Sequence, residues 1–348
     1  MQAQVLTSFD GPRGFQLHEV DEPRIEAPDD VKIRIEACGV CHRDITWSRG
    51  KFGRGELPRI LGHEGAGVVL DVGAAVEDLR PGDRVVHLQF PYCGKCEACR
   101  EGRPAGCTDL RAIVGEARNG CYAEQVVLPA RIVCKIPDEL SAEQAAVAAC
   151  TLGTAYHALR LYGFDPAGQT IALNGAGGGV GVHAIQIAKL LGARVIAVTS
   201  SAGKVEAIRA AGADHVVIAP DGVYRKKLGD LTNGRGPDLF LEIAGAPTLE
   251  QSLLSVRRGG RVVVVGNPDG GGCQFNPALL ILRGELMLYG SMAVTMVELK
   301  QILAFMAAGK LRPLIHRVAP LQDLPDLMRR MEERSTVGRA VVRPGGVR

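Results

Sequence analysis

The chain has 348 residues, of which 46% are hydrophobic, and a formal net charge of +3. This near-balance of charge, without a long lysine or arginine run, argues against nucleic acid or an anionic membrane as the main partner. No apolar run approaches the roughly 18 residues that span a bilayer, and the N-terminus lacks the features of a signal peptide. We therefore expect a soluble, cytoplasmic protein, and the length predicts two domains.

The first part of the chain, residues 1–151, is predicted to be rich in β-strands. Short apolar alternations at 31–37, 66–73 and 83–88 are separated by proline and glycine, which is typical of half-buried strands.

The pattern changes to alternating strands and helices over residues 152–290. Six apolar runs are candidate strands: 171–173, 195–199, 215–218, 239–243, 261–265 and 286–290. Strands that alternate with helices predict a parallel, doubly wound sheet of the α/β class. Residues 291–348 contain a strong helical pattern from Val297 to Ala308 and a final strand in GRAVVRP. We expect this last segment to return to the first domain.

A glycine-rich turn, NGAGGGVG, follows the first of these strands and precedes a helical segment. Ala176, Gly178 and Gly181 occupy the three glycine positions of the dinucleotide-binding pattern, with Gly179 and Val180 between them. Glycine lets the backbone approach a pyrophosphate, and amides at the helix start receive its charge. Such turns also occur as plain capping turns, but the strand before and the helix after favour a nucleotide site.

The residues after the second strand bear on which nucleotide is bound. Enzymes that use NAD usually carry an acidic residue there, which binds the ribose 2′-hydroxyl. This chain has Thr199, Ser200 and Ser201, with Lys204 nearby. Hydroxyls and an ammonium group suit a 2′-phosphate, so we expect NADP(H) to be preferred over NAD(H). The alternative is that these residues only cap the next helix. The two interpretations are compatible, because Ser201 could cap the helix while Ser200 and Lys204 bind the phosphate.

Four of the ten cysteines lie in one segment, at about 91–110. Cys93, Cys96, Cys99 and Cys107 have the spacing of a closed tetrahedral zinc site with no position for water, which makes such a site structural. Disulfides or free thiols are the alternative, and a reducing compartment disfavours disulfides.

Three other segments carry potential metal ligands, namely Cys41, His63 with Glu64, and Cys150. Two thiolates and one imidazole would leave zinc a fourth position for water or a substrate oxygen, as in catalytic zinc sites. These residues are far apart in sequence, so spacing leaves the alternative equally open that Cys150 and Cys41 are ordinary thiols.

Several motifs together resemble the zinc-containing medium-chain alcohol dehydrogenases: CGVCHRD, GHEGAGVV, PGDRV, the four-cysteine segment and GGVG. They occur in the right order over nearly the whole chain. The resemblance implies a GroES-like catalytic domain, a Rossmann coenzyme domain, and a homodimer or homotetramer. It also implies two zinc ions per chain, one structural and one catalytic, the latter held by Cys41, His63 and Cys150 with Glu64 close by.

The same resemblance assigns contacts with the coenzyme. His42 matches a residue that contacts the pyrophosphate, Thr154 matches one near the nicotinamide, and Arg339 matches a basic residue that reaches the phosphates. Gly266 is also predicted to bind the coenzyme. The implied reaction is hydride transfer between the nicotinamide and a carbonyl or alcohol that zinc polarises.

The pattern departs from alcohol dehydrogenases after His42. A serine or threonine usually relays the substrate proton from that position, but here it is Arg43, and a guanidinium cannot accept a proton. Thr46 stands where a relay histidine is expected. Either Thr46 or water takes over the proton transfer, or alcohol oxidation is not the main reaction.

The Arg43–Asp44 pair of residues and the alanine-first turn resemble enoyl-thioester reductases of the acryloyl-CoA reductase type. Arg43 would then hold an anionic group; the alternative is that it pairs with Glu64 or Asp44. Our first prediction is a zinc-dependent, NADP(H)-preferring alcohol dehydrogenase or carbonyl reductase. An NADPH-dependent enoyl-thioester reductase and a non-catalytic NADPH-binding protein are the alternatives. We expect the substrate to be a small molecule bounded by Thr46, Trp47, Phe52, Phe90, Asp109 and the segment around Met292.

Overall fold

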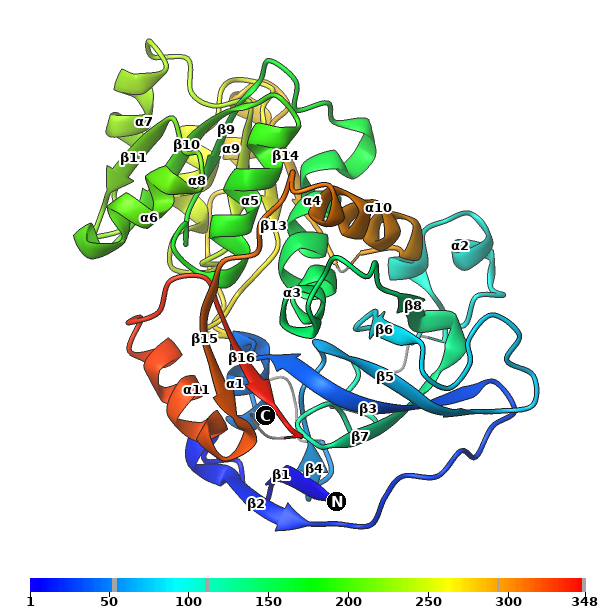
Figure 1. Ribbon diagram of the computed structural model, residues 1–348. Helices are drawn as coiled ribbons and strands as arrows, with labels where there is room; N and C mark the ends of the chain where they lie inside the picture. The colour runs from blue at the N-terminus through cyan, green and yellow to red at the C-terminus, as the bar shows by residue number, and fades with distance from the viewer. Residues whose placement is uncertain (52–54, 110–112, 293, 346–348) are drawn as a thin grey trace. The chain divides into compact units, whose positions relative to one another are not determined.

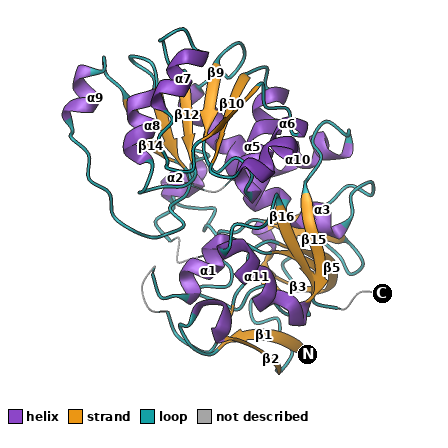
Figure 2. Ribbon diagram, turned by 90° about the vertical axis from the view of Figure 1, so that its left-hand side faces the viewer, coloured by secondary structure: helices purple, strands orange, loops and turns teal. Residues whose placement is uncertain are grey.

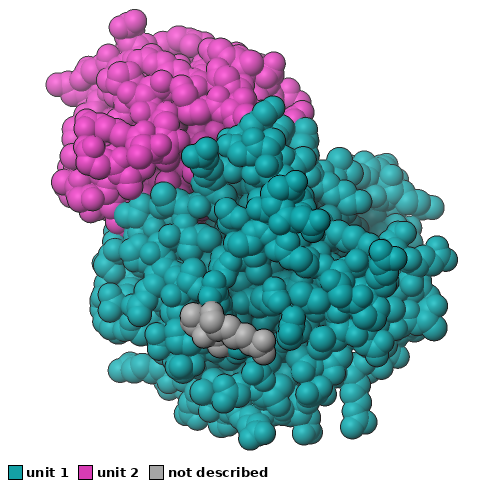
Figure 3. Space-filling view, in the orientation of Figure 1, with its two compact units in different colours: residues 1–153, 293–348 teal, residues 154–292 magenta. Residues whose placement is uncertain are grey.

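The computed structural model describes residues 1–51, 55–109, 113–292 and 294–345. Two compact units make up the chain (Figure 3), one of residues 1–153 with 293–348 and the other of residues 154–292. The sequence predicted domain boundaries after residues 151 and 290. The boundaries between the two units lie two residues later, after residues 153 and 292. Of the residues expected to bound the substrate, Phe52 lies outside the described part of the chain.

The first unit is built on a seven-stranded sheet (Figure 1). Its strand order is β15 (Ile315–Pro320), β16 (Arg339–Arg343), β3 (Asp30–Gly39), β5 (Gly65–Val72), β6 (Arg84–His87) and β8 (Val133–Lys135), and β7 (Gln125–Pro129) pairs with β3. The last strand, β16, pairs antiparallel with β3, where Val342 lies opposite Cys38. The end of the chain therefore lies beside the strand that leads into Cys41. A second sheet holds β2 (Phe15–Glu19), β1 (Gln2–Leu6) and β4 (Arg59–Ile60).

Short helices connect and flank these strands. They are η1 (Gly11–Gly14), α1 (His42–Ser48), α2 (Glu97–Arg100), η2 (Pro104–Gly106), η3 (Ala130–Ile132), α3 (Ala142–Ala146), the π-helix η4 (Ala148–Leu152), α10 (Met296–Ala307), η7 (Leu321–Asp323) and α11 (Leu324–Glu332). Capping boxes begin α3 at Ser141 and α10 at Thr295, where each hydroxyl accepts the amide of the third helical residue. The helix α10 begins and ends one residue before the range predicted from the sequence.

The second unit holds six parallel strands in the order β11 (His215–Ile218), β10 (Arg194–Thr199), β9 (Thr170–Leu173), β12 (Leu239–Glu242), β13 (Arg261–Val264) and β14 (Met287–Gly290). All six predicted strands are present, and each end is within one residue of the prediction. The order reverses between β9 and β12, which is the switch point where doubly wound sheets bind nucleotides. The prediction of a doubly wound α/β sheet is confirmed.

Helices cover both faces of this sheet (Figure 2), with α5 (Gly179–Leu190) and α6 (Val205–Ala210) on one face and α7 (Arg225–Leu231) and α8 (Leu249–Ser255) on the other. The remaining elements are α4 (Gly153–Arg160), η5 (Leu161–Gly163), η6 (Ala202–Lys204) and α9 (Ala278–Leu282). Buried apolar side chains from the central strands, including Ala172, Ile196, Phe240 and Val262, form the core beneath α7 and α8. In the described part of the chain, we find no helix with the length and apolar character that crossing a membrane requires.

Candidate functional site

Four potential metal ligands meet in the first unit although they come from three separate segments. Cys41 lies just before α1, His63 and Glu64 just before β5, and Cys150 within the buried π-helix η4. Their ligand atoms all lie within 4.8 Å of one another. Cys41 Sγ is 3.9 Å from Cys150 Sγ, and Cys150 Sγ is 3.7 Å from His63 Nε2. The structure thus brings together the four residues that spacing alone could not connect, and we call them the buried tetrad.

The electrostatics of the buried tetrad favour a cation. The contact with Cys150 lowers the pKa of the Cys41 thiol well below its ordinary value, and the same contact raises the pKa of Cys150 well above its own. Two thiols this close do not readily lose both protons without a cation between them. Thiolate and imidazole are the donors that zinc prefers, so the residues present fit the metal that the resemblance implies.

A buried arginine stands beside the tetrad. Arg339 in β16 is 3% exposed, and its guanidinium donates to both carboxylate oxygens of Glu64, with Nε 3.0 Å from Oε2. Its Nη2 atom also lies 3.5 Å from Cys150 Sγ. Because both side chains are buried, each charge of this pair compensates the other. The contact between Arg339 and the coenzyme phosphates stays a prediction, whereas the contact with Glu64 is observed.

His63 is held by a carboxylate on the side away from the tetrad. Its Nδ1 atom lies 3.1 Å from Asp44 Oδ1, and the hydroxyl of Tyr122 donates to Asp44 Oδ2 at 2.7 Å. A carboxylate in this position fixes the orientation and tautomer of a ligand histidine, so that Nε2 faces the metal site. The sequence analysis assigned no such role to Asp44 or Tyr122. The signal available for Asp44 was its place three residues after Cys41 in CGVCHRD.

Arg43 has a partner that the sequence analysis did not foresee. Its Nε and Nη2 atoms donate to Glu116 Oε1 and Oε2 at 2.7 and 3.1 Å. The expected carboxylates are engaged elsewhere, because Glu64 binds Arg339, and Asp44 contacts His63. The alternative was a pair with Glu64 or Asp44, and the partner observed in the structure is Glu116 instead.

The other two residues at the start of α1 are also placed. His42 is the first residue of the helix, and Thr46 Oγ1 donates to the carbonyl oxygen of His42 at 3.0 Å. This bond within one helical turn is common for threonine in helices. Thr46 is buried, and its role in proton transfer stays a prediction.

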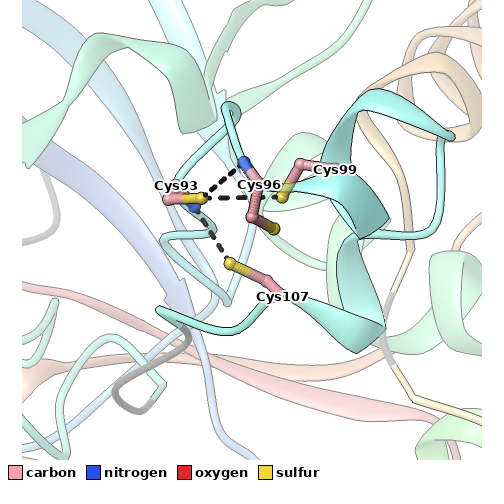
Figure 4. Close-up of side chains that lie close together, drawn as sticks. All are labelled: Cys93, Cys96, Cys99 and Cys107. Atoms are coloured by element: carbon pink, nitrogen blue, oxygen red, sulfur yellow. Dashed lines mark hydrogen bonds between the residues drawn. The ribbon is translucent and has the colours of Figure 1, made fainter.

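The four cysteines of the predicted structural site lie close together (Figure 4). Cys93 Sγ is 4.0 Å from Cys99 Sγ and accepts the amide N–H of Cys96 at 3.3 Å, and the amide of Cys93 donates to Cys107 Sγ at 3.3 Å. Hydrogen bonds from backbone amides to sulfur favour the thiolate. Those from the amides of Cys99 and Thr108 lower the pKa of Cys96 to about 6. All ten cysteines of the chain are free. Four thiolates in this arrangement fit a closed zinc site.

In the second unit the glycine turn connects β9 to α5, as expected. Gly178 precedes the helix, and Gly179, Val180 and Gly181 form its first turn. A Cβ atom on Gly181 would lie 2.3 Å from the carbonyl oxygen of Gly175, so only glycine permits this close packing. Amides at such a helix start are suited to a phosphate.

Other positions around this turn complete the candidate coenzyme site. Gly175 adopts φ +59°, a conformation that favours glycine, and the sequence pattern did not single it out. The predicted Ala176 is buried beside it. Gly266 follows β13, where a Cβ atom would lie 2.6 Å from the carbonyl oxygen of Ile243. Thr154 is buried near the start of α4.

Lys204 lies across the glycine turn. A Cβ atom on Gly177 would be only 2.6 Å from Lys204 Cδ, so the stem of the lysine packs on the backbone of the turn. Thr199 ends β10 and its Oγ1 accepts the amide of Ser201 at 3.2 Å, while Ser200 is exposed. Ser201 occupies the position before η6, but its side chain makes no capping bond, so the expectation that Ser201 caps this helix through its hydroxyl is wrong.

A buried carboxylate, missed by the sequence analysis, lies at the switch point. Glu242 ends β12 and its Oε1 accepts from Asn174 Nδ2 and Gly245 N, each at 2.7 Å, and from Thr248 Oγ1 at 2.9 Å. Asn174 Oδ1 in turn accepts the amide of Ile243 at 2.8 Å. These hydrogen bonds connect the loop after β12 to Asn174, the residue that begins the glycine turn.

Comparison with known proteins identifies the family. Residues 27–138 match the alcohol dehydrogenase GroES-like domain, and residues 179–308 match the zinc-binding dehydrogenase family. The acryloyl-coenzyme A reductase of Sulfurisphaera tokodaii is 32% identical over 96% of this chain and 98% of its own. An alcohol dehydrogenase of Geobacillus stearothermophilus is 35% identical over 99% of both chains. The chain in the crystal structure of AibC has 40% sequence identity to this chain, and the two structures superpose with a TM-score of 0.90. The match covers 99% of this chain and 95% of the AibC chain. The expected GroES-like and Rossmann architecture is confirmed, and the chain belongs to the zinc-containing alcohol dehydrogenase family of the medium-chain dehydrogenase/reductase superfamily.

Proposed function

We propose that this oxidoreductase is an NADPH-dependent reductase of α,β-unsaturated acyl thioesters. The observation that carries the proposal is the bidentate pair of Arg43 and Glu116. A carbonyl reductase must deliver a proton to the substrate oxygen, and Arg43 occupies the position from which a hydroxyl usually relays it. Thr46, the other relay candidate, donates its proton to the carbonyl oxygen of His42. This arrangement favours a reaction in which the proton is added to a carbon atom of the substrate and not to its oxygen.

Conjugate reduction has that property. Hydride adds to the β-carbon, the alkene electron pair moves toward the thioester carbonyl, and a proton from solvent completes the α-carbon. NADPH is oxidised to NADP⁺, and the alkene, which gains one hydride and one proton, becomes a saturated acyl chain. A zinc ion held by Cys41, His63 and Cys150 would supply Lewis acidity toward the carbonyl oxygen.

The chain's own residues hold this site in place. Asp44 orients His63, and Arg339 holds Glu64 beside the ligands. Arg43 follows Cys41 by two residues in the sequence, and its side chain, which is 36% exposed, is held by the ion pair with Glu116. In this proposal Arg43 binds an anionic or strongly polar part of the substrate, while Glu116 fixes its orientation.

The proposed preference for NADPH rests on the end of β10. Thr199, Ser200 and Ser201 stand where an acidic residue would bind an unphosphorylated ribose, and Lys204 packs on the phosphate-binding turn. Ser200 and Lys204 are the groups we assign to the 2′-phosphate.

A carbonyl reductase or alcohol dehydrogenase is the second candidate. The buried tetrad favours it, because its donor set is that of zinc sites that polarise a carbonyl. The relative from Geobacillus stearothermophilus is named an alcohol dehydrogenase. The tetrad also argues against a non-catalytic NADPH-binding protein, which has no need of such a site.

Product analysis separates these candidates. Purified, zinc-loaded protein with NADPH is offered but-2-enoyl thioester, an enone and an aldehyde. A saturated thioester or ketone supports the proposal, and an allylic alcohol from the enone supports the second candidate. The variant Cys41→Ser tests the metal site in either case. If the variant keeps full activity, our assignment of the buried tetrad to catalysis is wrong.

The expected homo-oligomer has a candidate surface in the second unit. Ile281 and Leu282 in α9 are 72% and 71% exposed, and α9 is followed by β14 at the edge of the sheet. Exposed apolar side chains beside an unpaired sheet edge are a feature of self-association sites. We assign this surface to a second copy of the chain, and sedimentation of the purified protein measures the association.

A further inference from the structure

Two buried polar side chains bind each other at the carboxyl edge of the sheet in the second unit. Asn174 directly follows β9, and Glu242 is the last residue of β12. Asn174 Nδ2 donates to Glu242 Oε1 at 2.7 Å, and we call this contact the Asn174–Glu242 bridge. Strands β9 and β12 are the neighbours between which the strand order reverses. Doubly wound sheets bind a dinucleotide across this point, so the bridge connects the two halves of the proposed coenzyme site.

The side-chain amide of Asn174 also holds the backbone of the loop after β12. Its Oδ1 atom accepts the amide N–H groups of Ile243 and Ala244 at 2.8 and 3.1 Å. The residue after Asn174, Gly175, adopts φ +59°, and a Cβ atom on it would lie 3.2 Å from Ile243 Cγ2. The glycine turn and the loop after β12 therefore pack closely, and the side chain of Asn174 joins them.

The carboxylate of Glu242 binds further groups in and after this loop. Its Oε1 atom accepts from Gly245 N at 2.7 Å and from Thr248 Oγ1 at 2.9 Å, and its Oε2 atom accepts from Ser252 Oγ. A buried polar network whose members are hydrogen-bonded to one another makes its surroundings rigid. The network around Glu242 therefore holds the loop after β12 in one position.

The loop after β13 is attached to the same loop. Asn267 Oδ1 accepts the amide N–H of Ala246 at 3.1 Å. A Cβ atom on Gly266 would lie 2.6 Å from the carbonyl oxygen of Ile243, so these two loops also approach closely. The loops after β9, β12 and β13 are thus held together at the edge of the sheet where we place the coenzyme.

An arrangement of this kind prepares the protein for a ligand that contacts both halves of the sheet. If the loops are not already in position, part of the binding free energy is used to order them, and affinity falls. We propose that Asn174 and Glu242 are positioning residues for the coenzyme, and that coenzyme affinity depends on the bridge between them. Neither residue has to touch the coenzyme. The inference rests on the proposed coenzyme site and applies to both candidate reactions.

Titration of the purified protein with NADPH and NADH, followed by protein fluorescence, tests this inference. Glu242→Leu removes the acceptors and leaves Asn174 Nδ2 and Gly245 N without this partner. It should weaken the binding of both coenzymes by the same factor, about tenfold, because the bridge does not act on the 2′-phosphate. Glu242→Gln keeps an oxygen acceptor toward Asn174 and should bind both coenzymes nearly as tightly as the parent.

Thr248→Val is a milder variant in case Glu242→Leu folds poorly. It keeps the shape of the side chain and removes one of the donors to Glu242 Oε1. Binding of both coenzymes should weaken about threefold. Hydrogen exchange without coenzyme gives a second readout, because the amides of residues 243–246 should exchange faster in Glu242→Leu and in Thr248→Val than in the parent.

Asp238→Leu is the matched control. Asp238 is also buried and also joins β12 to β9, since its Oδ2 atom accepts the amide N–H of Thr170 at 2.9 Å. It precedes β12, however, and therefore lies at the amino edge of the parallel strands, opposite the bridge. Asp238→Leu should lower the free energy of unfolding but leave the affinity for both coenzymes unchanged.

The outcomes separate the inference from the function on which it rests. If the parent binds the coenzymes and both Glu242→Leu and Thr248→Val bind them equally well, the inference is overturned and the proposed coenzyme site stands. An equal loss of affinity in Asp238→Leu also overturns it, because reduced stability alone would then explain the loss. If the parent binds neither coenzyme, the proposed function fails and the inference fails with it.

Discussion

Arg339 in the last strand binds both carboxylate oxygens of Glu64, 275 positions earlier in the chain. Both side chains are buried, and the guanidinium also contacts Cys150. The end of the chain thus supplies a fixed positive charge to a site that otherwise contains two thiols, an imidazole and a carboxylate. This contact explains how a buried carboxylate is stabilised among the potential metal ligands.

The first prediction concerns this ion pair. Arg339→Met should lower the free energy of unfolding by roughly 3–5 kcal/mol, because it leaves the carboxylate of Glu64 buried and uncompensated. Urea unfolding of the metal-free protein measures the change. Arg317→Met, at a half-exposed arginine of β15, is the control and should change stability little. Equal stability of the two variants would show that Glu64 does not need the charge of Arg339.

The second prediction concerns the carboxylate behind His63. Asp44→Asn should weaken zinc binding at the buried tetrad about 10- to 100-fold, as is usual when the outer partner of a ligand histidine is changed. Competition with a chromogenic chelator measures the affinity, and the four-cysteine site should keep its metal. Asp78→Asn changes an exposed residue and serves as the control. Unchanged affinity in Asp44→Asn would exclude the orienting role.

The sequence predicted the parts of this fold that are determined locally. The six strands of the second unit were found within one residue, because each is an apolar run bounded by turn residues. The four-cysteine site was evident from its spacing. The buried tetrad was accessible only through the family resemblance, since nothing local shows that Cys41, His63 and Cys150 meet.

Contacts between distant segments could not be predicted. The partner of Arg43 is Glu116, 73 positions away and in a loop without a recognisable pattern. Nor does the sequence show that Gly175 needs a positive φ, because the dinucleotide-binding pattern assigns no glycine to that position. In each case the missing information is the packing of segments that the fold brings together.

The third prediction concerns the choice of coenzyme. Lys204→Ala should weaken NADPH binding about tenfold and leave NADH binding nearly unchanged, because the ammonium is assigned to the 2′-phosphate. Quenching of protein fluorescence on titration with each coenzyme gives both constants. Lys226→Ala, at an exposed lysine of α7, is the control. A similar loss for NADH and NADPH would assign Lys204 to the glycine turn and not to the 2′-phosphate.

The fourth prediction gives a pH dependence within the second unit. Burial opposes ionisation of Asp238, but bonds from the amide of Thr170 and from Arg257 lower its pKa below the ordinary 3.8. A depressed pKa stabilises the fold above the ordinary pKa, and this contribution is lost as the pH falls through the lower value. Asp238→Asn should therefore reduce stability by about 1–3 kcal/mol at neutral pH. The difference from the parent should shrink as the pH falls below 3.8.

Chemical unfolding across the pH range measures this difference. Asp230→Asn, at an exposed aspartate of α7, should show no such pH-dependent gap. If the difference in unfolding free energy between the parent and Asp238→Asn stays constant down to acid pH, the hydrogen bonds of Asp238, and not its charge, stabilise the strands.

The last prediction concerns the residue on which the proposed function depends. Arg43→Thr introduces a hydroxyl at the position from which alcohol dehydrogenases relay the substrate proton, and it removes the cation bound by Glu116. With an enone and NADPH, the product ratio should shift toward allylic alcohol, while kcat/KM for the enoyl thioester falls. Glu116→Gln is the informative partner variant, because it keeps Arg43 and weakens only its orientation. It should lower kcat/KM for the thioester without any gain in alcohol. If Arg43→Thr leaves both the product ratio and kcat/KM for the thioester unchanged, the Arg43–Glu116 pair does not determine which bond is reduced, and the carbonyl reductase candidate becomes the stronger one.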